Sequence, residues 1–111
     1  MKTITEKMEQ TINEKQQLTT ALHKKLNQLT SLEIDEKTER ADLMSSDLSD
    51  KIEGKITEKA KVAYCDKTLK PKIDSIEWLE NDITKIKNQI GLCNDKISLY
   101  KYTIRELELS K

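Results

Sequence analysis

The sequence predicts an all-α protein, either an elongated helical hairpin or a three-helix bundle with antiparallel coiled-coil packing. Only 35% of the 111 residues are hydrophobic and 36% are charged, against about 45–50% and about 25% in an ordinary globular domain. Such a chain lacks the apolar residues for a thick core. It has only 2 glycines and 1 proline, so turn-rich sheets, sandwiches and barrels are nearly excluded. The architecture that remains compatible with this composition is a set of long helices that share narrow apolar seams.

The strongest signal is a heptad repeat in the last half of the chain. With Val62 as position a, thirteen of the fourteen a and d positions from 62 to 107 are apolar, and Lys72 is the exception. A repeat this long in one register is typical of a coiled-coil seam and predicts a helix over about 72–108. Cys65 and Cys93 fall at d and are expected to be small buried apolar residues. The other residues assigned to this seam are Leu69, Ile76, Leu79, Ile83, Ile86, Ile90, Ile97, Tyr100, Ile104 and Leu107.

The rest of the chain is expected to complete a single helical domain over 1–111. Apolar residues at steps of three and four predict a first helix over about 3–33. The charged and serine-rich stretch of about 34–50 is expected to be weak or broken. Asp50 and Glu53 resemble a capping pair and predict a helix over about 50–70. Because the heptad register crosses Pro71 without a shift, a kink in one long helix is favoured over a hairpin at 66–72.

A second apolar stripe lies beside the seam, at position c of the heptad: Tyr64, Trp78, Leu92 and Leu99. A two-stranded coiled coil would leave these side chains largely in water. The stripe has three interpretations. A third helix of the same bundle covers it, or it binds a protein partner with Trp78 as anchor, since tryptophan is enriched at interface hot spots, or its exposure is incidental.

Charge is balanced overall, with 20 basic and 20 acidic residues. The segment 51–72 is locally basic, and Lys51, Lys55 and Lys59 recur every four residues, so a helix would place them on one face. This face is either solvated or makes phosphate contacts. Nucleic-acid binding through this segment is the alternative function, and it would weaken steeply with salt.

No constellation of residues indicates catalysis, and the chain is expected not to be an enzyme. The single histidine, His23, falls off the apolar stripe and is expected at the surface. No phosphate-loop, dinucleotide or metal motif occurs, so no metal or cofactor is expected. No apolar run approaches the roughly 20 residues of a membrane span. The first ten residues lack the apolar region of a secretory signal, so a cytoplasmic location without membrane association is expected.

Two families share features with this sequence. Two long helices joined by a middle segment resemble prefoldin-type chaperones in outline, although those carry β-hairpins and residues 34–60 show no strand pattern. The isoleucine heptads over 62–107 look like those of small helical accessory proteins of phages and secretion systems. We therefore expect a non-enzymatic protein–protein interaction module, such as a small coiled-coil adaptor, inhibitor or chaperone-like protein. Self-association, as a dimer, is also expected, because small chains with little core often need it for stability.

Overall fold

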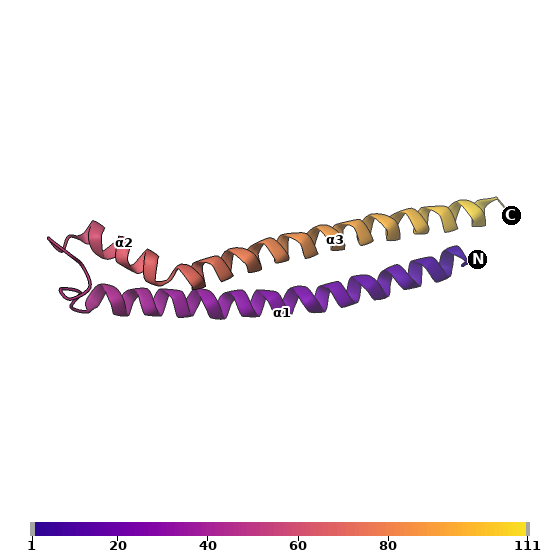
Figure 1. The fold of residues 1–111 in the computed structure, drawn as a ribbon. Coiled ribbons are helices and arrows are strands. Elements are labelled where there is room, and N and C mark those ends of the chain that lie inside the picture. The colour runs from indigo at the N-terminus through magenta and orange to yellow at the C-terminus, as the bar shows by residue number, and fades with distance from the viewer. Residues whose placement is uncertain (1, 111) are drawn as a thin grey trace. The chain divides into compact units, whose positions relative to one another are not determined.

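The structure, a computed structural model, describes residues 2–110, and its regular elements are three helices (Figure 1). They are α1 (Ile4–Ser45), α2 (Glu58–Thr68) and α3 (Lys70–Leu109). The expectation of an all-α helical hairpin or bundle is confirmed. Contacts divide the chain into two compact units. Unit 1 comprises Met1–Leu26 and Asp82–Lys111, and unit 2 comprises Asn27–Asn81. The prediction of a single domain stays a prediction.

Helix α1 begins after the capping residue Thr3 and runs further than expected. The Thr3 hydroxyl oxygen accepts a hydrogen bond of 3.1 Å from the backbone N–H of Glu6, which satisfies one of the free amides of the first turn. The expected end near residue 33 is wrong, since 34–45 is helical. Glu36 and Arg40 form an i, i+4 ion pair of 2.8 Å along the helix, so the charged stretch supports the helix instead of interrupting it.

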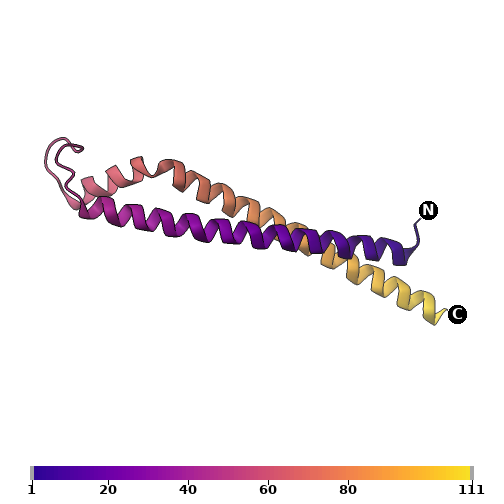
Figure 2. The same cartoon turned by 90° about the horizontal axis from the view of Figure 1, so that it is seen from below.

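The break lies in the connection of residues 46–57, which joins α1 to α2 (Figure 2). The predicted helix over 50–70 is therefore too long at its start, and Asp50 does not cap it. Thr57 is the N-cap of α2, and its hydroxyl accepts from the backbone N–H of Ala60 at 3.1 Å. Gly54 has a φ of +82°, a left-handed conformation that glycine adopts without steric cost and that cannot occur within an α-helix. The buried side chain of Leu48 anchors the connection.

A single residue, Leu69, separates α2 from α3. The backbone N–H of Leu69 donates to the Cys65 carbonyl at 2.8 Å, and the N–H of Ile73 donates to the Leu69 carbonyl at 2.9 Å. Helical hydrogen bonds therefore continue on both sides of the interruption, and the alternative of a hairpin at 66–72 is wrong. Pro71 is the second residue of α3, where the N–H that proline lacks has no partner to lose in a newly started helix.

Within each unit, α1 and the later helices run antiparallel. In unit 1, Thr3 and Ile4 share a cleft with Ile104 and Leu107, and Lys25 forms an ion pair with Asp82. In unit 2, Glu39 pairs with Lys72 and Arg40 with Asp66. Residues later in α1 thus contact residues earlier in α2 and α3, as in a helical hairpin.

Candidate interaction surfaces

The predicted seam lies against α1 in both units. Leu69 and Cys65 are the most buried residues of unit 2, and Ile83 and Cys93 are buried in unit 1. Seven further seam residues are half-buried, namely Ile76, Leu79, Ile86, Ile90, Ile97, Tyr100 and Ile104. Val62 and Leu107, at the two ends of the repeat, are exposed. Because the a and d positions between them are withdrawn from water, the seam is used within the chain.

The matching face of α1 is more polar than the seam it covers. Its buried or half-buried positions recur at steps of four and three: Ile4, Met8, Thr11, Lys15, Leu18, Leu22, Lys25, Leu29, Leu32 and Glu36. Thr11 is buried, and its hydroxyl donates to the carbonyl oxygen of Lys7 at 2.9 Å. The hydroxyl is thereby satisfied without a partner on α3, so a polar side chain is tolerated in the seam.

Ion pairs join the helices of unit 2. The guanidinium of Arg40 donates through Nε to Glu36 and through Nη1 to Asp66, each at 2.8 Å. These hydrogen bonds, the one to Glu36 first and the one to Asp66 second, raise the pKa of Arg40, because an anion favours the charged form. Lys72, the one polar residue of the α3 seam, pairs with Glu39. The exception in the heptad therefore has a carboxylate partner on α1.

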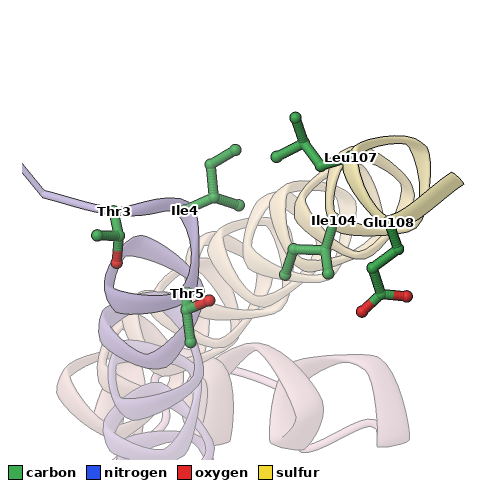
Figure 3. A pocket seen from close by; sticks show the side chains of 6 residues that line it. All are labelled: Thr3, Ile4, Thr5, Ile104, Leu107 and Glu108. Carbon is green, nitrogen blue, oxygen red and sulfur yellow. The ribbon is translucent and has the colours of Figure 1, made fainter. Parts of the chain in front are cut away.

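Unit 1 has an open end, where α1 begins and α3 finishes. Figure 3 shows a cleft there, with Ile4 from α1 and Ile104 and Leu107 from α3. Leu107 is 52% exposed, so its placement in a buried seam is wrong. The antiparallel pairing brings Ile104 beside the first residues of α1, and Leu107 is one turn further along α3. It therefore lies at the mouth of the cleft.

The second stripe is largely uncovered. Trp78 in unit 2 is 71% exposed, and Leu92 and Leu99 in unit 1 are 61% and 60% exposed. Tyr64 on α2 is half-buried. The interpretation that a third helix of the same bundle covers this stripe is therefore wrong for Trp78, Leu92 and Leu99. Binding of a protein partner by these four residues stays a prediction.

Two further exposed apolar residues of α3 were not expected from the sequence. Tyr102 and Leu109 are both exposed in unit 1. They are seven residues apart, and Tyr102 follows Leu99 by three, so they extend the same outer side of the helix. The signal that identifies them in the sequence is this spacing, which places both at heptad position f.

The expected lysine face does not form. Lys59 lies in α2, whereas Lys51 and Lys55 lie in the connection before it. The phosphate-contact hypothesis assumed that the three lysines lie on one continuous helix, and this assumption is wrong. Glycine in a left-handed conformation at position 54 separates the residues that a continuous helix would have aligned.

The connection contains one carboxylate with a perturbed titration. The backbone N–H of Ser49 donates to Asp47 Oδ1 at 3.0 Å. This bond, together with one from the Ser49 side chain, lowers the pKa of Asp47, because both favour the charged carboxylate. The arrangement is an Asx turn, which orders the chain as it leaves α1.

Among residues 2–110, no group of three or more His, Cys, Asp or Glu side chains could hold a metal ion. His23 is exposed, as expected. The two cysteines are free and buried, Cys65 in unit 2 and Cys93 in unit 1. No helix in the described part of the chain is both long and apolar enough to cross a membrane. The expectations of no enzymatic activity, no cofactor and a cytoplasmic location stay predictions.

Comparison with known proteins found no matching family model, no matching curated protein and no matching solved structure.

Proposed function

We propose that the chain is a non-enzymatic protein-interaction module, a small coiled-coil adaptor, inhibitor or chaperone-like accessory protein. One observation carries the proposal. Apart from Leu107, the seam of α3 is buried or half-buried, yet Trp78 on the same helix is 71% exposed. A tryptophan exposes a large apolar surface to water at considerable cost, and that cost is recovered when a partner covers it.

The surroundings of Trp78 support this role. Ser75 and Asn81 lie three residues before and after it on the same face of α3, and both are exposed. An apolar anchor with a polar rim is the usual composition of a protein interface, where the rim excludes water from the central residue. The stripe continues to Tyr64 in unit 2, and in unit 1 it comprises Leu92 and Leu99.

The experiment uses the full chain as bait in an extract of the organism that encodes it. Trp78→Ala is expected to reduce recovery of the bound protein at least about tenfold, because truncation of a hot spot costs about 2 kcal/mol or more. Helicity and the melting temperature should stay unchanged, since the residue packs against little of its own chain. Ile34→Ala is the matched control, because Ile34 is also an exposed apolar residue of unit 2.

A direct measurement follows with the partner so identified. Trp78 is the only tryptophan, so fluorescence reports on this position alone, and its emission should shift to shorter wavelength when the partner covers the ring. Unchanged emission in the complex, or undiminished recovery by Trp78→Ala, would contradict the proposal. A large fall in melting temperature on Trp78→Ala would instead assign the ring to internal packing.

A further inference from the structure

A shallow hollow of about 410 Å³ on α3 is lined by Ser98, Lys101, Tyr102 and Arg105. All four residues belong to unit 1, and all four are exposed. We propose that this hollow binds a phosphate group, either free or carried by a small molecule. The inference goes beyond the proposed function, because Trp78 lies in unit 2 and has no part in this site.

The helix brings four hydrogen-bond donors together in the hollow. Their positions follow one another at steps of three, one and three, so two successive turns place them on one side of α3. The side chains carry a hydroxyl, an ammonium, a phenol and a guanidinium, each of which donates to oxygen. No carboxylate is among the described residues that line the hollow. The hollow therefore offers donors and positive charge, which is what an oxyanion requires.

These donors are not occupied by the chain itself. Within residues 2–110, none of the four side chains forms a hydrogen bond or an ion pair. Lys101 has no acid three or four residues away on the helix. Glu108 follows Arg105 by three residues, but it lines the cleft at the open end of unit 1 (Figure 3). The donors are thus available to a ligand.

The two arginines of the chain differ in this respect. Arg40 donates to Glu36 and Asp66, each at 2.8 Å, whereas Arg105 has no carboxylate partner among the described residues. Arg105 also lies four residues from Lys101, and like charges at this spacing destabilise a helix slightly. A bound anion removes that repulsion, so the two neighbouring cations favour binding.

Two cations favour a doubly charged ligand over a singly charged one. A phosphate monoester carries a charge of about −1.5 to −2 at pH 7 and presents three acceptor oxygens. The planar fork of Arg105 can hold two of these oxygens, and the ammonium of Lys101 can meet the third. A carboxylate has one charge and two oxygens, so the guanidinium alone would satisfy it. The second cation therefore points to phosphate.

Tyr102 extends the site beyond the phosphate. Its side chain is 62% exposed and lies one residue from Lys101 and three from Arg105. Exposed aromatic rings beside basic residues stack on the bases of single-stranded nucleic acids. A nucleotide therefore has a second contact that inorganic phosphate lacks, and the two sources can be separated by experiment.

The experiment titrates the full chain and follows its backbone amide resonances by NMR spectroscopy at constant ionic strength. The probes are inorganic phosphate, adenosine monophosphate and acetate. We expect saturable shifts confined to the amides around residues 98–105, with dissociation constants near about 1 mM for the phosphate probes, as suits a shallow site with few contacts. Acetate should bind at least about tenfold more weakly, because one cation is left without a partner.

The two phosphate probes distinguish the source of the ligand. Tighter binding of adenosine monophosphate would assign the site to nucleotides, and Tyr102→Leu should then reduce its affinity to that of inorganic phosphate. Equal affinity would assign the site to phosphate without a base. Both results support the proposal.

Arg105→Gln should weaken binding of both phosphate probes at least about tenfold, because it removes the charged fork. Lys85→Gln is the matched control, since Lys85 is an exposed lysine of α3 in unit 1 outside the hollow. It should leave the dissociation constants unchanged. Circular dichroism checks that each variant is folded.

Three results would overturn the inference. They are the absence of saturable shifts with either phosphate probe up to about 10 mM, binding of acetate as tight as that of phosphate, or equal weakening by Lys85→Gln and Arg105→Gln. The last result would show that anions are attracted to the lysines of the chain in general. The proposed function is tested by a different readout, the capture of a protein by Trp78→Ala.

Discussion

The two units use the same antiparallel helix pairing but hold it together differently. Unit 2 contains the connection and the buried Leu48, Cys65 and Leu69, and its helices are joined by the ion pairs of Arg40 and Lys72. Unit 1 ends in an open cleft and carries the exposed stripe of α3. Both units leave apolar surface uncovered, Trp78 in unit 2 and Leu92 and Leu99 in unit 1, but the fully buried side chains gather in unit 2. A uniform heptad seam therefore does not imply uniform packing.

The largest effect should come from Leu69, which is 1% exposed where α2 meets α3. Leu69→Ala should lower the free energy of unfolding by about 2–5 kcal/mol, the sum of lost burial and the remaining cavity. Urea denaturation followed by circular dichroism at one fixed chain concentration measures it. Ile34→Ala should change stability by less than about 0.5 kcal/mol. A loss below about 1 kcal/mol for Leu69→Ala would show that unit 2 is not held by its buried residues.

A smaller effect is expected for the ion pairs of unit 2. Arg40→Gln removes contacts with Glu36 and Asp66 and should cost about 1 kcal/mol, because the guanidinium is partly shielded and serves two carboxylates. Lys70→Gln breaks a single, more exposed pair with Asp74 and should cost only about 0.3 kcal/mol. Denaturation at low and high salt measures both. An equal loss of unfolding free energy in the two variants would show that an ion pair between two helices stabilises the protein no more than one within a single helix.

The smallest effect concerns unit 1 and has the opposite sign. Thr11→Val should raise the free energy of unfolding by up to about 1 kcal/mol, since it replaces a hydroxyl in the seam by a methyl group. The Lys7 carbonyl loses only an additional bond, because it lies within the helix and keeps its backbone partner. Thr20→Val is the control, because Thr20 makes the same kind of bond to Gln16 but is exposed. Destabilisation by Thr11→Val alone would mean that the buried hydroxyl has a role in the seam.

The helices and the α3 seam could be predicted because both depend on residues close together in the sequence. The steps of three and four that predicted burial for Ile76, Ile83 and Ile90 are a property of one helix, whatever covers it. The outer stripe was predicted in the same way at Leu92 and Leu99. Tyr102 and Leu109 were not predicted, because they belong to heptad position f, whereas Leu92 and Leu99 belong to position c.

The boundaries of α1 and α2 could not be predicted in the same way. The charged stretch after residue 34 is supported by the local pair of Glu36 and Arg40 and also by the contact of Arg40 with Asp66 on α2, a residue far away in the sequence. Asp50 was a plausible cap, but Thr57 caps α2 in its place once Gly54 takes a left-handed conformation. Several residues can cap a helix, and local sequence does not rank them when the intervening segment must also close a connection.

The sequence by itself determined that this protein is helical, that its sparse apolar residues form a seam, and that Lys72 is the exception within it. Only the tertiary structure decided that Glu39 forms an ion pair with Lys72 and that Leu107 lies at an open end. It also decided that Trp78, Leu92 and Leu99 stay exposed. The reason is physical. Periodicity is a property of one helix, whereas exposure depends on what packs against that helix, and this is settled by residues that lie far away in the chain.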